Sequence, residues 1–418
     1  MSAYFLPADI LLPDFEKYSG TAWSVVACDQ YTSQPEYWEE VKAKVGDDPS
    51  TLNMILPEAY LDQREDRIPA LHANMDLYVK EVLINHPNSM FYVERTQSNG
   101  KVRRGLIGMV DLEQYDYNKG SRSLIRATEG TVLDRIPPRL DVRRGASLEL
   151  PHVMLLIDDP EKTVIEPIAA RTETLQTVYA FPLMQQSGSV VGRLVDSVGI
   201  GRISNALEKL ISPERVRARY GEGIAPLLFA VGDGNHSLAT AKAAYEEIKA
   251  AHGDSALYHP ARYALVEVVN LHDDALHFEP IYRVMFNVDP NDVLAKLEQY
   301  SFELSGSAAP QQARFLSATR RGTIHFGAPA EQLVVGTLQT FIDAYLAEHP
   351  EATVDYIHGS KTVEALATKE RAVGFLFSGM EKSQLFSAVM RDGALPRKTF
   401  SMGAAADKRF YLECRKIR

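Results

Sequence analysis

The sequence has little cysteine and no long apolar run. Of its 418 residues only two are cysteine, Cys28 and Cys414, near opposite ends of the chain. Two thiols exclude a disulfide scaffold, a thiolate zinc cluster and an iron–sulfur cluster held by this chain alone. The densest apolar stretch, 226–231, is far shorter than the ~20 residues of a membrane-spanning helix. The N-terminus lacks the basic start of a signal peptide. We therefore expect a cytoplasmic protein with no membrane partner.

Basic charge is also scarce. The chain has 45 Lys and Arg against 55 Asp and Glu, which gives a net charge of −10. A protein that binds nucleic acid over a broad surface needs the opposite balance. We therefore expect a small-molecule substrate and no nucleic-acid partner, while assembly into a homo-oligomer remains open.

Apolar residues make up 45% of the chain, enough for a sizeable core. Strand patterns at 153–157, 227–231 and 263–269 alternate with helical patterns such as 237–251. Asn99-Gly100 is a hairpin-turn signal between two further strands. The pattern predicts an α/β or α+β fold with mixed sheets and flanking helices. We expect a main α/β domain over 1–287 and a C-terminal α/β subdomain over 288–418.

The most informative segment is the strand, turn and helix around GDGNHS. Its glycines permit a sharp turn and close approach of a ligand, and the start of a helix suits phosphate. Asp233 is a candidate metal ligand, and the candidate phosphate-binding residues here are Asp233, Gly234, Asn235, His236 and Ser237. A helix end contributes only ~0.3–1 kcal/mol, whereas micromolar affinity needs about 8 kcal/mol. A phosphate site therefore requires a cation from elsewhere. The alternative is an ordinary βα turn in which His236 caps the helix.

A second candidate is the arginine-rich segment 122–144, which holds six arginines and no lysine. Guanidinium groups bind phosphate or carboxylate through two parallel hydrogen bonds. We take Arg126, Arg135 and Arg139 as candidate phosphate ligands, and Glu129 as a candidate base or magnesium ligand. The alternative is a solvated hairpin with surface ion pairs.

Two further segments carry polar clusters. Asp29 ends a predicted strand and precedes a polar loop, which is typical of an active-site loop. The alternative is helix capping by Thr32 or Ser33. Between His272 and Glu279 lie five metal-ligating residues, but the two histidines are five positions apart, which fits neither one helix face nor one strand face. A charged loop is the better interpretation there.

Six motifs together resemble the bacterial and archaeal domain-of-unknown-function family 1015 over nearly the whole chain. They are VVACDQYTSQPEYW, IRATEGTVLDRIPPR, LPHVMLLIDDPEKTVIEP, GDGNHSLATAK, NLHDDALHFEPIYR and LPRKTFSMG. Other branches of that family carry D-G-H-H-R-Y at the fourth motif; this chain keeps His236 but has Ser237 in place of the arginine and Leu238 in place of the tyrosine. The D-G-x-H form at a helix start is similar to the phosphate-binding turn of the ParB/sulfiredoxin superfamily, which includes nucleotide-dependent kinases of free serine. The resemblance implies a ParB/sulfiredoxin-like phosphate-binding core.

These observations lead to the hypothesis of a phosphotransferase that phosphorylates a small hydroxyl compound, with free L-serine as the first choice. ATP, ADP or pyrophosphate would be the donor, and Mg²⁺ would bridge its phosphate oxygens. Arg126, Arg135 and Arg139 would neutralise the transferring charge, and Asp29, Glu129 and His236 are the candidate catalytic residues. A non-catalytic nucleotide- or phosphometabolite-binding regulator is the alternative. A metal-dependent hydrolase, built on the segment from His272 to Glu279, is the third hypothesis.

Overall fold

The structure is a computed structural model that describes residues 4–303, 311–327, 329 and 331–418. Its contacts divide the chain into two units. The first comprises Met1–Leu276 together with Gly403–Arg418, and the second comprises His277–Met402. The sequence analysis placed a single division after residue 287 and assigned the whole C-terminal end to the second part. In the structure the last sixteen residues return to the first unit.

The first unit is built on a nine-stranded mixed sheet in the order β10-β11-β4-β5-β13-β9-β12-β7-β6. This sheet confirms the mixed α/β class. Its strands are β4 (Phe91–Thr96), β5 (Val102–Asp111), β6 (Tyr115–Asp116), β7 (Ile125–Ala127), β9 (Met154–Ile157), β10 (Thr177–Pro182), β11 (Ser189–Leu194), β12 (Phe229–Asp233) and β13 (Tyr263–Asn270). The turn at Asn99-Gly100 joins β4 to β5, which pair antiparallel as the hairpin signal predicts.

Strand directions place polar segments at two opposite edges of this sheet. β12 runs parallel to β7 and antiparallel to β9, and β9 runs parallel to β13. The carboxyl ends of β7 and β12 therefore lie at the same edge as the start of β9. We call this the β12 edge. The carboxyl ends of β9 and β13 lie at the opposite edge.

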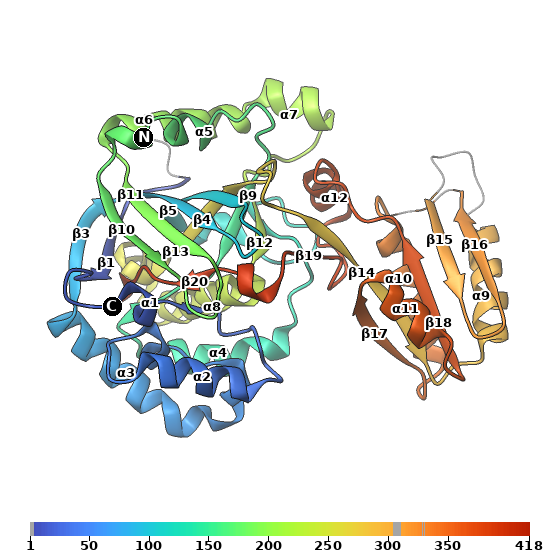
Figure 1. Cartoon of the computed structure of the whole chain (residues 1–418). Coiled ribbons are helices and arrows are strands. Elements are labelled where there is room, and N and C mark those ends of the chain that lie inside the picture. Colours follow the sequence, from blue (N-terminus) through green and yellow to red (C-terminus); the bar gives the residue numbers. More distant parts are fainter. Residues whose placement is uncertain (1–3, 304–310, 328, 330) are drawn as a thin grey trace. The chain divides into compact units, whose positions relative to one another are not determined.

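Helices α6 (Ser197–Leu210) and α7 (Pro213–Tyr220) lie at one end of the first unit in Figure 1, and α2 (Pro35–Val45), α3 (Arg64–Glu81) and α4 (Ile136–Arg143) lie at the other. Pro35 occupies the first turn of α2, where its missing N–H costs nothing. The N-cap of α2 is Gln34, without a side-chain hydrogen bond. The prediction that Thr32 or Ser33 caps this helix is therefore wrong, because the turn that follows β2 (Val25–Val26) continues to Gln34.

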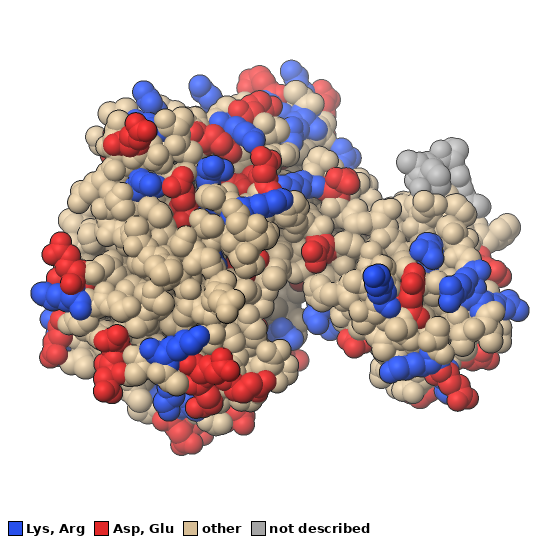
Figure 2. Space-filling view, in the orientation of Figure 1, with Lys and Arg blue, Asp and Glu red and all other residues tan. Residues whose placement is uncertain are grey.

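Helix α8 (Asn235–His252) packs its apolar face into the core beneath the sheet, with Leu238, Ala241 and Tyr245 buried. It starts two residues before the predicted segment 237–251, because Gly234, in a left-handed conformation, is the N-cap. Among the described residues, no helix combines the length and apolar character that a membrane crossing requires. On the face shown in Figure 2, basic and acidic side chains of the first unit are interspersed.

The second unit has its own antiparallel sheet in the order β16-β15-β18-β14-β17, with β19 paired to β14. Its strands are β14 (Phe278–Phe286), β15 (Gln311–Leu316), β16 (Arg321–Phe326), β17 (Thr353–His358), β18 (Ala372–Phe377) and β19 (Phe400–Met402). The helices described here are α9 (Pro290–Glu303), α10 (Val334–Glu348), α11 (Ser360–Ala367) and α12 (Gln384–Asp392). Strand β14 lies between β18 and β17 in this sheet and begins ten residues before the boundary expected at 288.

Buried ion pairs hold the C-terminal segment on the first unit. Arg409 contacts Glu267 of β13 at 2.7 Å and Glu413 at 2.6 Å, and Arg103 of β5 contacts Glu267 at 3.3 Å. All four side chains are almost fully buried. Burial by itself would raise the pKa of Glu267, but Arg103 and Arg409 lower it below its ordinary value. Short strands complete the attachment: β20 (Phe410–Tyr411) pairs with β2 (Val25–Val26), and β21 (Arg415–Lys416) pairs with β8 (Leu148–Glu149).

We predict that Glu267→Ala destabilises the protein by about 3–5 kcal/mol, because it leaves two buried guanidinium groups without their shared partner. Glu247→Ala is the matched control, since Glu247 pairs with Arg144 at 2.6 Å on the exposed surface, where such pairs contribute about 0–1 kcal/mol. Urea unfolding followed by circular dichroism measures both. Equal midpoints for the two variants would contradict the structural role of Glu267.

Candidate functional site

The turn between β12 and α8 forms the first part of the candidate site. Gly234 has φ +78°, and a side chain there would meet the backbone of Val153 at 3.0 Å, so glycine is required. The first intrahelical bond runs from the Leu238 amide to the Gly234 carbonyl at 3.0 Å. The N-cap residue of α8 is Gly234, which has no side chain to accept a hydrogen bond from the first turn. The backbone N–H groups of Asn235, His236 and Ser237 therefore stand at the positive end of an eighteen-residue helix.

A cation from the far end of the chain lies at this turn. The Lys408 Nζ is 3.1 Å from one oxygen of Asp233, and the other oxygen accepts the Gly234 amide at 3.0 Å. The two side chains are only 15% and 17% exposed. Lys408 is thus a cation beside the start of α8, paired with Asp233. The sequence analysis missed it, because nothing in the local sequence ADKRF distinguishes it from a surface lysine.

Asp29 reaches the same group of charges from the end of β2. Its side chain is 31% exposed and accepts a hydrogen bond from the side-chain Nε2 of Gln30 at 3.0 Å. The other carboxylate oxygen lies 3.7 Å from Nε2 of His152. Burial would raise the pKa of Asp29, but His152, the Gln30 hydrogen bond and Lys408 together lower it below its ordinary value. Asp29 is therefore a carboxylate at neutral pH.

His152 and Tyr411 hold Asp29 from behind. Nδ1 of the buried His152 lies 2.8 Å from the Tyr411 hydroxyl, which also accepts the Cys28 amide at 3.3 Å. Burial raises the pKa of Tyr411, so its phenol stays protonated. When that phenol donates to Nδ1, the imidazole carries its own proton on Nε2, facing Asp29. The sequence analysis also missed these two residues, since 259 positions separate them.

His236 is a neutral histidine at the start of α8. Its Nε2 accepts a hydrogen bond from the Val132 amide at 3.3 Å, which leaves the ring proton on Nδ1. Burial lowers the pKa of His236, and Arg139 and Arg135 lower it further, to about 4, against the opposing charge of Asp29. His236 is therefore a hydrogen-bond donor at neutral pH, not a cation.

The structure brings the other predicted residues to different places. Arg139 forms an ion pair with Glu58 and donates to the Arg135 carbonyl at 2.6 Å. The charges of both arginines act on His236, so they lie on the His236 side of the site.

Arg126 lies elsewhere: it is buried, and its guanidinium donates to the carbonyls of Ser123, Ala225 and Pro226 at 2.8–3.2 Å. Arg126 therefore stabilises the segment before β12, at residues 225 and 226.

Glu129 follows β7 at the β12 edge and is half-buried. Two polar atoms here, Oδ1 of Asn235 and Oγ1 of Thr131, are buried without a hydrogen-bond partner among the described residues. A buried acceptor without a partner is costly, and it is common where a ligand completes the hydrogen bonds.

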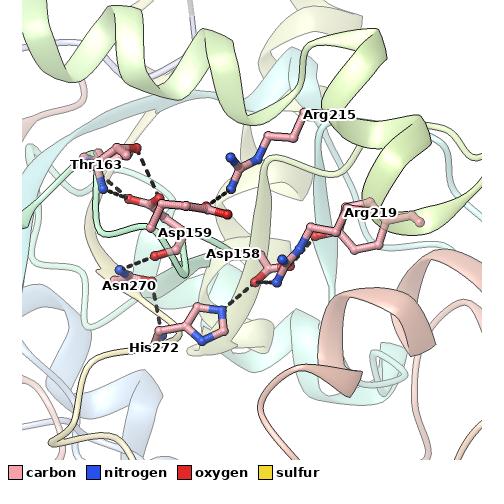
Figure 3. Close-up of polar contacts among 10 residues, drawn as sticks. Asp158, Asp159, Thr163, Arg215, Arg219, Asn270 and His272 are labelled. Carbon is pink, nitrogen blue, oxygen red and sulfur yellow. Dashed lines mark hydrogen bonds and ion pairs between the residues drawn. The ribbon is translucent and has the colours of Figure 1, made fainter.

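The opposite edge of the sheet carries a closed network, shown in Figure 3. Asp158 accepts two hydrogen bonds from Arg219 at 2.7 Å, one from the Tyr220 hydroxyl, and lies 2.6 Å from Nε2 of His272. Burial would raise the pKa of Asp158, but His272, Arg219 and Tyr220 lower it to about 2. Every oxygen of this carboxylate is occupied. The network attaches α7 to the sheet.

The segment from His272 to Glu279 does not form a metal centre. Within the described ranges, no group of three or more His, Cys, Asp or Glu side chains is arranged to hold a metal ion. His272 is instead engaged with Asp158. The hydrolase hypothesis therefore has no site in this part of the chain.

This mixed α/β protein therefore has, at its β12 edge, a helix start with a glycine N-cap. A lysine, two arginines and an ionised carboxylate lie near the same turn. The chain belongs to the family described as "Protein of unknown function (DUF1015)", which matches residues 12–385. Lys408 and Tyr411 lie beyond that matched range.

Three solved structures show distant similarity. A free serine kinase variant in complex with ADP is 10% identical, with 76% of this chain and 93% of that chain covered and a TM-score of 0.39. A conserved hypothetical protein from Pyrococcus furiosus is 11% identical, with 72% and 91% covered and a TM-score of 0.35. SbnI from Staphylococcus aureus, truncated at its C-terminus, is 9% identical, with 71% and 83% covered and a TM-score of 0.35. No curated protein matches the sequence significantly.

We predict that His236 stays neutral, with its proton on Nδ1, from pH 8 down to about pH 5. Its folded pKa of about 4 lies below the ~6.5 of an unfolded histidine. Protonation therefore favours the unfolded chain, and the contribution of His236 to stability is lost as the pH falls from about 6.5 to about 4. Nitrogen NMR of labelled histidine measures both tautomer and pKa. Arg139→Gln should raise the pKa, whereas Arg144→Gln, on the exposed surface, should leave it unchanged.

Proposed function

We propose that this chain is a phosphotransferase that moves a phosphoryl group from a nucleotide or pyrophosphate to the hydroxyl of a small metabolite. The observation that carries the proposal is the convergence of the α8 start, Lys408 and the ionised Asp29 at the β12 edge. Phosphoryl transfer needs positioning and charge stabilisation more than covalent chemistry. These residues supply both. L-serine is the first acceptor to test, on the strength of the D-G-x-H resemblance.

In this proposal the backbone amides of Asn235, His236 and Ser237 bind the phosphate chain of the donor, with the Nδ1 proton of His236 as a further donor. Lys408 moves from Asp233 onto the transferring phosphoryl group, and Arg135 and Arg139 add positive charge nearby. Because these groups lie in a partly buried site, their interaction with phosphate is stronger than it would be in water.

Asp29 orients the acceptor hydroxyl. A bond forms between the acceptor oxygen and the terminal phosphorus while the bond from that phosphorus to the bridging oxygen of the donor breaks. The hydroxyl proton passes to Asp29 and then to water. A carboxylate with a lowered pKa is a weak base, which suits a loose transition state in which the proton leaves late. Glu129, at the same edge, is the other candidate base.

Mg²⁺ fits this site only in part. Both oxygens of Asp233 already have partners, Gly234 and Lys408. A nucleotide-bound Mg²⁺ takes most of its ligands from phosphates and water and needs only one or two carboxylates, so Asp233 and Asp29 are the residues that would hold it. The ion would neutralise phosphate charge.

The second candidate function is a nucleotide- or phosphometabolite-binding regulator without turnover. One observation favours it: both titratable groups closest to the reaction, Asp29 and His236, have lowered pKa values and are weak bases. Binding that raises the unfolding temperature without chemical change would support this alternative.

Phosphorus NMR of the full chain with Mg²⁺ and L-serine distinguishes the two functions. ATP, ADP and pyrophosphate are supplied as donors in parallel. A new phosphomonoester signal is the expected result and identifies the donor. Donor hydrolysis without that signal would indicate another acceptor. Three intact donors would overturn serine kinase activity and favour the regulator.

We predict that Lys408→Met lowers kcat by about a hundredfold or more, as expected for loss of a charge that stabilises the transition state. It should also raise the pKa of Asp29, because Lys408 helps to lower it, and so move the acidic limb of the kcat/KM profile to higher pH. Lys249→Met is the matched control, because Lys249 lies in the last turn of α8, at the end opposite Gly234, and pairs with Glu113. An unchanged rate in Lys408→Met would remove Lys408 from the mechanism.

A further inference from the structure

Tyr31, two residues after Asp29, has an unusual backbone conformation. Its φ is +52°, in the left-handed region, and it is the one aromatic residue among the non-glycine residues with positive φ in the described chain. A bulky side chain in this region is strained and persists only where the surroundings impose it. Tyr31 sits in the turn between Asp29 and α2, and its carbonyl accepts the Gln34 amide at 3.1 Å.

This conformation holds the Tyr31 ring flat against a second tyrosine. The rings of Tyr31 and Tyr37 are 3.7 Å apart between centroids and only 11° from parallel, and Tyr37 meets Trp38 edge-on. Trp38 is fully buried, whereas Tyr31 and Tyr37 are half-buried. Trp38 in the core thus contacts Tyr37, and Tyr37 stacks on Tyr31, which is itself packed against the edge of the core. We call the Tyr31 ring the aromatic platform.

Tyr31 is near two acidic residues of this region, Asp29 along the chain and Asp407 in space. Tyr31 is two residues from Asp29 in the chain. Burial raises the pKa of Tyr31, and the carboxylate of Asp407 raises it further, which places the phenol near the residue next to Lys408. Asp407 is fixed there by hydrogen bonds from the Ser98 amide at 2.7 Å and the Ser98 hydroxyl at 3.0 Å. An aromatic surface and a phosphate-binding turn are thus joined through adjacent residues, 407 and 408.

We propose that the phosphoryl donor of this protein is a nucleotide whose base stacks on Tyr31 while its phosphates lie at the start of α8. This inference rests on the proposed function and narrows the donor class, since pyrophosphate has no ring to place on the platform. A base that stacks on an aromatic side chain gains about 1–3 kcal/mol, with little dependence on which base it is. The site would therefore discriminate weakly between adenine and guanine nucleotides.

The test compares ADP and pyrophosphate, each with Mg²⁺, by calorimetric titration of the full chain. Tyr31→Ala and Tyr31→Leu should weaken ADP binding about 5- to 150-fold, which is the stacking energy expressed as an affinity ratio, and leave pyrophosphate binding unchanged. Tyr31→Phe should bind ADP as the unsubstituted protein does. Tyr258→Ala is the control, because Tyr258 is 91% exposed.

Each outcome separates this inference from the proposed function. If the unsubstituted protein binds neither ligand, both are overturned. If it binds both and the Tyr31 variants change neither affinity, the phosphate site stands and the stacking role is wrong. If Tyr31→Leu weakens ADP and pyrophosphate equally, Tyr31 supports the loop and not the base. Only selective loss of ADP binding upholds the inference.

Discussion

The buried ion pair between Glu267 and Arg409 is the interaction on which the candidate site depends. Glu267 lies on a central strand of the sheet, and Arg409 enters from the last residues of the chain, with Arg103 and Glu413 completing the charge balance. A charge buried this deeply is tolerated only with its partner in place. The ion pair therefore fixes the position of the C-terminal segment, and with it the two neighbours of Arg409 that matter most, Lys408 and Tyr411.

Acidic and basic side chains have different roles at the two opposite edges of the nine-stranded sheet. At one edge Asp158 is fully occupied by Arg219, Tyr220 and His272, and the network holds a helix in place. At the other edge fewer groups are paired: the N-cap of α8 is a glycine without a side chain, and buried oxygens of Asn235 and Thr131 have no hydrogen-bond partner among the described residues. An anion could accept hydrogen bonds from the start of α8 and from Lys408, whereas Oδ1 of Asn235 is an acceptor and needs a donor from the ligand. At the first edge the Asp158 oxygens already have partners.

Local patterns in the sequence predicted much of the fold but only half of the site. The mixed sheet, the β4–β5 hairpin and the strand–turn–helix around Gly234 follow from apolar periodicity and turn residues, which act over a few positions. Asp29 and His236 were identified because each follows a strand at a polar turn. His152, Lys408 and Tyr411 were missed, since no local pattern marks them. Arg126 was placed among the phosphate ligands on composition alone, and only its buried contacts with three carbonyls show what it binds.

The sequence by itself determined that this is a mixed α/β protein of low cysteine content and net negative charge, with a glycine turn at the start of a helix. Tertiary structure alone decided which side chains surround that turn and in which charge state. Residues 29, 152, 233 and 408 meet only because the folded chain brings distant segments together. Local sequence patterns do not show which distant segments pair, nor the loop-closure entropy that the pairing costs. The pKa of Asp29 is lowered by His152, Gln30 and Lys408 against the effect of burial. The pKa of His236 is lowered by burial and by Arg139 and Arg135. Both shifts therefore exist only in the folded protein.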